Sequence, residues 1–176
     1  MTDDDRGRRG RRRPQLAGSI KTARPTERGL EIVLQLRNPG ARALHYIADV
    51  RGMRYDPVAR RLTVRLTDEG RTVIPGAMGR LPQFRVIDPN SDSELSITLP
   101  ATIVKLAETS APSGDLTLEE HRTTDATEVD VDIAFADTPF YQDPRRRDDT
   151  RLPAEQWQQG QLRLSGRTEP QAPRSR

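Results

Sequence analysis

Hydrophobic and polar side chains alternate along much of the chain, and the clearest example covers residues 29–40. Its apolar positions are Leu30, Ile32, Leu34 and Leu36. Strict alternation with a period of two places such side chains on one face of an extended strand. The pattern ends at Asn38-Pro39-Gly40, residues that are typical of turns. The sequence therefore predicts a central β-strand with one buried face.

Most later apolar runs repeat this alternation. The further stretches predicted to be extended are residues 16–22, 43–54, 60–67, 84–87, 94–99 and 128–136. Residues 101–107 fit either a short strand or one turn of helix, and the sequence leaves both open. The strands predicted at 29–40, 43–54 and 60–67 follow one another closely and are joined by short turns. This arrangement predicts antiparallel hairpins rather than parallel strands with helical crossovers.

The last clear strand, residues 128–136, has apolar residues on one face and Asp130 and Asp132 on the other. Two residues apart on an extended strand, these aspartates lie about 7 Å from each other. Carboxylates at this distance could share a cation if other ligands converged on them. A solvated acidic outer face is the simpler interpretation, and the sequence favours it.

The chain has 176 residues, enough for one domain with tails but too few for two well-buried cores. Residues 1–14 are rich in arginine and cannot bury enough apolar surface to offset the entropy of ordering, so we expect a disordered arm. Residues 15–142 are the expected β-sandwich domain, and residues 143–176 the expected flexible tail. In this tail, residues 153–159 fit the start of a short helix, and residues 161–164 are expected to be extended.

Three aromatic residues at the end of the domain and in the tail are candidates for protein binding. Phe140 and Tyr141 are expected to fold back as a hydrophobic clasp over the end of the sandwich. Trp157 is the only tryptophan and is flanked by glutamines. A lone aromatic residue in a polar tail is typical of a short docking peptide, because aromatic anchors dominate small interfaces. The alternative is that Trp157 packs against its own domain.

The order of strands, the stop at residues 38–40, the turn at residues 88–90 and the strand at residues 128–136 together resemble bacterial immunoglobulin-like or fibronectin-like sandwiches. The resemblance covers about residues 16–141 and is architectural, since the Cys-Trp-Cys pattern of antibody domains is absent. It implies an all-β fold: an antiparallel immunoglobulin-like β-sandwich of about seven strands with disordered basic termini. Such a fold is a scaffold for contacts and can host many functions.

Positive charge is concentrated at the two ends of the chain. The net charge is +3, but residues 1–14 carry six Arg and three Asp, and residues 145–176 carry eight Arg and four acidic residues, so the region between them is mildly acidic. The N-terminal arginines could neutralise phosphates and give salt-dependent, sequence-neutral binding to nucleic acid. A solubilising tail or a protein contact is the alternative, because charge runs are usually solvated. The candidate nucleic-acid-binding residues are Arg8, Arg9, Arg11, Arg12 and Arg13.

Residue types that serve catalysis or metal binding do not come together in the sequence. The chain has no cysteine, which excludes disulfides, thiolate catalysis and sulfur-based zinc sites. His45 and His121 lack the spacing of a triad or a metal site, and we expect His45 to face outward on a strand and His121 to lie in a loop. Residues 88–94 begin like a calcium loop, but Ser93 replaces the required glycine, so the sequence favours a turn.

No stretch approaches the about 18 apolar residues of a membrane helix, and no apolar segment follows the N-terminal arginines as a secretory signal would require. We expect a cytoplasmic protein with no catalytic residue, cofactor, metal or membrane contact. The sequence predicts a non-enzymatic protein-interaction module, a cytosolic adaptor or assembly subunit that docks on another protein through a sandwich edge and its C-terminal tail. The alternative is a nucleic-acid-associated protein tethered by its N-terminal arginine arm.

Overall fold

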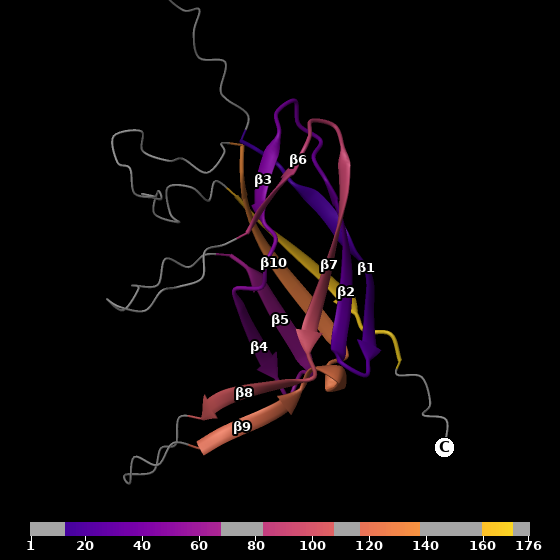
Figure 1. Cartoon of the computed structure of the whole chain (residues 1–176), viewed down its shortest axis with the longest axis vertical. Helices are drawn as coiled ribbons and strands as arrows, with labels where there is room; N and C mark the ends of the chain where they lie inside the picture. Colours follow the sequence, from indigo (N-terminus) through magenta and orange to yellow (C-terminus); the bar gives the residue numbers. More distant parts are fainter. Residues whose placement is uncertain (1–12, 68–82, 108–116, 138–159, 171–176) are drawn as a thin grey trace, which may run out of the picture.

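The computed structural model describes residues 13–67, 83–107, 117–137 and 160–170 (Figure 1). Within these ranges the chain forms eleven strands in three sheets, one of them mixed, and one short 3-10 helix. No α-helix occurs in the described ranges. The all-β class predicted from the alternation is confirmed.

The first sheet contains the strand predicted to be central. β2 (Gly29–Arg37) lies between β1 (Ala17–Thr26) and β7 (Asp92–Pro100), and both neighbours are antiparallel to it. The apolar side chains at alternate positions of β2 are fully buried, whereas the positions between them are partly exposed. The predicted strand and its end before Asn38 are therefore confirmed.

The second sheet is mixed and is built around β10 (Glu128–Ala136). Its other strands are β3 (Leu44–Ile47), β4 (Gly52–Asp56), β5 (Arg61–Leu66), β6 (Phe84–Ile87) and β11 (Gly160–Arg167). The order is β4-β5-β10-β3-β6, and β11 also pairs with β10. Phe135 of β10 pairs with Tyr46 of β3 and with Gly160 of β11, so these two strands lie on opposite edges of β10.

Two expectations about this sheet are wrong. Residues 43–54, predicted as one extended segment, form the separate strands β3 and β4. The break falls at residues 48–51. The amide of Ala48 still donates to the carbonyl of Gln83 (2.8 Å), in register with β6, but the amide of Gln83 donates to the carboxylate of Asp49 (2.8 Å), and the ladder ends there. The predicted antiparallel hairpin holds for β4 and β5 but not for β2 and β3, which lie in different sheets, and β5 is parallel to β10. A parallel pair needs a long connection, and alternation within a strand does not encode such a distant partner.

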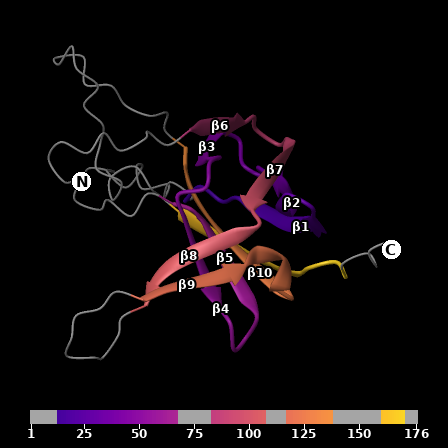
Figure 2. The same cartoon turned by 60° about the horizontal axis from the view of Figure 1, so that its bottom comes forward.

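A two-stranded hairpin lies at one end of the two larger sheets, in front of β5 and β10 in Figure 2. It consists of β8 (Thr102–Ala107) and β9 (Thr117–Arg122), which pair in antiparallel register. The 3-10 helix η1 (Thr123–Asp125) follows β9 and leads into β10. The ambiguity over residues 101–107 is thus resolved in favour of a strand.

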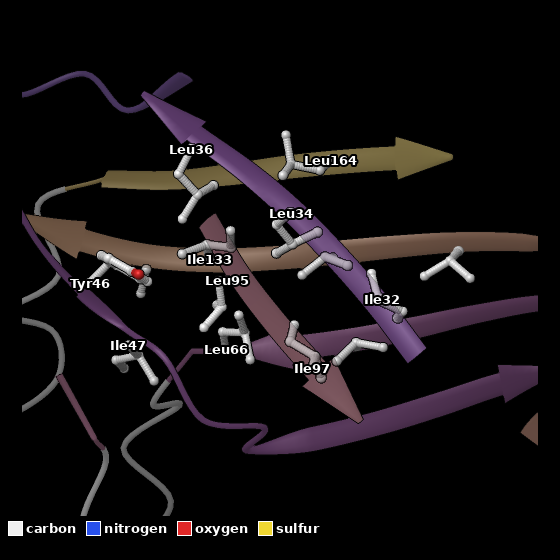
Figure 3. Close-up of a cluster of buried hydrophobic side chains, with 14 of the residues drawn as sticks. Ile32, Leu34, Leu36, Tyr46, Ile47, Leu66, Leu95, Ile97, Ile133 and Leu164 are labelled. Carbon is white, nitrogen blue, oxygen red and sulfur yellow. The ribbon is translucent and has the colours of Figure 1, made fainter. Parts of the chain in front are cut away.

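The hydrophobic core lies between the two larger sheets (Figure 3). Side chains from alternate positions of β2 and β7 face side chains from β3, β5, β10 and β11. The labelled core residues are Ile32, Leu34, Leu36, Leu95 and Ile97 on one side, and Tyr46, Ile47, Leu66, Ile133 and Leu164 on the other. Burying each such aliphatic side chain contributes about 1.5–3 kcal/mol, so this layer is the main source of stability.

The strand β11 lies within the segment 143–176 that the sequence predicts as a tail. It pairs with β10 along its whole length, and Leu164 is only 5% exposed. β1 packs close to it, because a Cβ added to Gly166 would lie 3.2 Å from the side chain of Ile20. The extended conformation predicted for residues 161–164 is confirmed, and residues 160–167 belong to the folded sandwich.

Asn38, where the central strand ends, ties its own loop to the end of β6 and the turn that follows it. Its side chain is fully buried, and its Nδ2 donates to the carbonyls of Arg42 (2.7 Å), Ile87 (3.0 Å) and Asp88 (3.1 Å). Its Oδ1 accepts a hydrogen bond from the amide of Gly40 (3.0 Å). Buried polar groups are stable only when they are hydrogen-bonded, so the amide of Asn38 fixes the path of the chain at this end of the sandwich.

We expect Asn38→Asp to destabilise the fold by at least about 2 kcal/mol, because a carboxylate oxygen would replace the donor that faces three carbonyls. Asn90→Asp is the matched control, since Asn90 is exposed in a neighbouring turn. Urea unfolding of both variants measures the difference. Equal unfolding free energies for the two variants would contradict this role of Asn38.

Candidate functional site

Most of the residues assigned to binding from the sequence lie outside the described residues. These are Phe140, Tyr141 and Trp157 for protein, and Arg8, Arg9, Arg11 and Arg12 for nucleic acid. Arg13 is described and exposed. It lines a hollow at one end of the sandwich together with Arg42 and Asp137, which form an ion pair of 3.2 Å.

The hairpin β8–β9 presents a different candidate surface, and its base is anchored to the sandwich. The hydroxyl of Thr123 donates to the carbonyls of Pro100 (2.7 Å) and Ala101 (3.2 Å), and the amide of Thr123 donates to Ala101 (2.9 Å). Thr123 is fully buried. These bonds hold together the two ends of the chain that enter and leave the hairpin, so its base has a defined position.

One face of the hairpin packs against the sandwich. His121 lies on β9, and its ring centroid is 5.2 Å from that of Tyr55 on β4. Its Nε2 is 3.5 Å from a carboxylate oxygen of Glu119. Ile103, directly opposite His121, is partly buried against the core. The expectation that His121 lies in a loop is therefore wrong: the histidine is part of the contact that seats the hairpin.

The opposite face of the hairpin is exposed and carries two aliphatic side chains. Val104 is 59% exposed and Leu118 is 65% exposed. Val104 pairs directly with Glu120, and Leu118 lies two residues from Glu120, so all three share one face. Glu120 is exposed and has no ion-pair partner among the described residues. We call Val104, Leu118 and Glu120 the hairpin face: two aliphatic side chains beside one carboxylate, with the exposed Arg122 at the base of the hairpin on the same side of β9.

The aspartates of β10 do not form the solvated acidic face that the sequence favours. Asp130 is only 8% exposed, and it accepts a hydrogen bond from the hydroxyl of Ser165 (2.7 Å). Asp132 binds the guanidinium of Arg163 through two hydrogen bonds of 2.6 and 2.8 Å. This contact raises the pKa of Arg163 above its usual value. Both carboxylates are occupied by partners on β11, so the outer face of this sheet is a row of paired charges.

Residues 88–92, which begin like a calcium loop, form a turn as the sequence favours. Asn90 has a positive φ of 53°, and its amide donates to the carbonyl of Gly40 (3.1 Å). The left-handed conformation is one that asparagine tolerates in turns. Among the described residues, no group of three or more acidic or histidine side chains is placed to hold a metal ion. The described residues also contain no helix that is long and apolar enough to cross a membrane.

His45 lies on β3 between two buried residues and is itself half-buried. Burial lowers its pKa below the usual value, and this effect outweighs the nearby charge of Asp137, which acts in the opposite direction. In the unfolded chain the pKa of histidine is about 6.5. Below that pH the unfolded chain therefore binds more protons than the folded chain, and protonation of His45 favours unfolding.

We expect the free energy of unfolding to fall as the pH drops below about 6.5, and His45→Gln to weaken this dependence. Urea unfolding of the native chain and of His45→Gln between pH 5 and pH 8 measures it. An unchanged pH dependence in His45→Gln would show that other groups cause the loss.

Comparison of the chain with protein-family models, with curated proteins and with solved structures finds no match. The fold and the surfaces described above are therefore the basis for the function proposed below.

Proposed function

We propose that the chain is a non-enzymatic protein-interaction module, a cytosolic adaptor or assembly subunit that docks on another protein. The single observation that carries this proposal is the hairpin face. Exposed aliphatic side chains are ordinary when they are scattered, but two of them on the same face of a projecting hairpin form a small contact surface. The anchored base of the hairpin reduces the entropy lost when a partner binds.

The hairpin face also indicates the chemistry of the partner. Val104 and Leu118 need apolar groups opposite them, and the free carboxylate of Glu120 favours a cationic group. A protein surface that places Lys or Arg beside aliphatic side chains provides both. We propose this class of partner for the hairpin, with Phe140, Tyr141 and Trp157, which lie between β10 and β11 in the sequence, as a second docking segment.

We also propose that the sandwich is a variant of the immunoglobulin-like architecture. The order β1-β2-β7 matches strands A, B and E of that fold, and β10 between β3 and β11 matches strand F between strands C and G. The strand β5 departs from the immunoglobulin-like pattern. It pairs in parallel with residues 128–133 of β10, on the edge where β3 pairs only with Phe135 and Ala136.

Val104→Asp is expected to abolish capture of the partner, because it places a charge at the centre of the apolar contact. Val58→Asp is the matched control: Val58 is 94% exposed, outside the hairpin. Affinity capture from the source cells with each tagged full-length variant, followed by mass spectrometry, measures the difference. Proteins retained by the native chain and Val58→Asp but lost with Val104→Asp support the proposal. Equal retention by both variants contradicts it.

Nucleic-acid binding is the second candidate function. It is favoured by the continuation of the arginine-rich arm into the exposed Arg13, at the hollow that also contains Arg42. If the six arginines of residues 1–14 each neutralise a phosphate, the affinity for duplex DNA falls with salt with a logarithmic slope of roughly −5. Fluorescence anisotropy at several salt concentrations measures this slope. Deletion of residues 1–14 should remove the binding, and a weak, salt-independent affinity of the full chain would exclude this function.

A further inference from the structure

Within the part of the chain that the structure describes, no strand pairs with the edge of β7 that faces away from β2. β7 has nine residues and pairs with β2 in unbroken register from Asp92 to Pro100. Among the described strands, β2 is its only sheet neighbour. The backbone groups along the other edge of β7 are therefore available to a further strand, which is the usual basis of association between sheet edges.

Other edge strands of the described sandwich carry features that prevent such pairing. β1, at the opposite edge of the same sheet, has a register shift between Ile20 and Thr22, a lysine at that shift and a proline at Pro25. β4 and β6 have only five and four residues. β11 carries Arg163 and Arg167 and lies beside β1. Bulges, lysine, proline and short length are the devices that protect natural edges.

β7 lacks these devices along most of its length. It contains no lysine or arginine, its register with β2 shows no bulge, and its only proline is its last residue, Pro100. Leu95, Ile97 and Leu99 are buried on the core face, while Ser96 and Thr98 are exposed on the other. The strand is therefore amphipathic and pairs with β2 without a bulge. Its free edge lacks the lysine, bulge and internal proline that protect other edges.

The sequence of β7 is also complementary to itself. In an antiparallel pair of two β7 strands centred on Ser96, Leu95 lies opposite Ile97 and Glu94 lies opposite Thr98. The apolar positions then continue the core face, and no like charges lie directly opposite each other. Glu94 is in addition bound to Lys21 within its own chain (2.8 Å), so the acidic ends of the two strands do not repel strongly.

We propose that a second copy of this chain pairs with the free edge of β7, in antiparallel register around a two-fold axis at Ser96. The two three-stranded sheets then form one continuous six-stranded sheet, and the interface is isologous, as in most homodimers. The dimer contact lies on β7 and is independent of the hairpin face, which lies on β8 and β9.

The chain has no cysteine, so single cysteines test the register directly. Directly opposite residues of an antiparallel pair have Cα atoms about 4.5–5.5 Å apart, within the range of a disulfide. Ser96→Cys should therefore cross-link two full-length chains under mild oxidation. The matched control is Thr98→Cys, whose two copies would lie about 13 Å apart along the strands and should cross-link roughly ten-fold more slowly. Equal rates for the two variants, or no cross-linking of Ser96→Cys, overturn the register.

The oligomeric state provides a second, independent measurement. By light scattering after size-exclusion chromatography, the native chain should have twice its mass of 19.8 kDa. Ser96→Lys should be monomeric, because it places two ammonium groups together on the axis, while Ser19→Lys on the protected edge strand β1 should remain dimeric. Circular dichroism confirms that both variants are folded. The proposal is overturned if the native chain stays monomeric at the highest concentration reached. It is also overturned if Ser96→Lys remains dimeric.

Discussion

The sandwich depends on β10 having a hydrogen-bonded neighbour along both of its edges. β11 occupies one edge, and β5 followed by β3 occupies the other. Val129, Val131 and Ile133 of β10 are fully buried, so water does not reach the backbone beside them. Each buried backbone group left unpaired would cost roughly 1–3 kcal/mol. Strands from three distant parts of the chain must therefore meet at β10 before its burial becomes favourable.

The local pattern of the sequence predicted the strands better than their partners. β2, β5, β7 and β10 were predicted because alternation over one strand is a local signal. The parallel pairing of β5 with β10 depends on chain segments far apart, and at the break between β3 and β4 the carboxylate of Asp49 binds the amide of the distant Gln83. Alternation of Leu162 and Leu164 with Arg163 was a signal for β11, but the arginine-rich composition around it indicated a tail. The extended conformation of residues 161–164 was predicted but their pairing with β10 was not, so the partners of Asp130 and Asp132 on β11 were not predicted either.

The same framework determines which surfaces are free for binding. Charges on the outer face of β10 are neutralised within the sheet by Arg163 and Arg61, so this face offers few unpaired groups to a ligand. The hairpin face is different because it combines exposed aliphatic side chains with an unpaired carboxylate. The free edge of β7 offers backbone groups instead of side chains. The sequence could not locate either surface, since exposure and sheet order are tertiary properties.

The central claim is that β11 completes the sandwich by covering one edge of β10. Deleting residues 160–176 tests it most directly, with deletion of residues 171–176 as the control that leaves β11 intact. Urea unfolding followed by circular dichroism should show that the shorter deletion preserves the native transition. The longer deletion should remove the cooperative transition or shift its midpoint far below the native value. A native midpoint after removal of residues 160–176 would contradict the account, because β10 would then be stable with one edge uncovered.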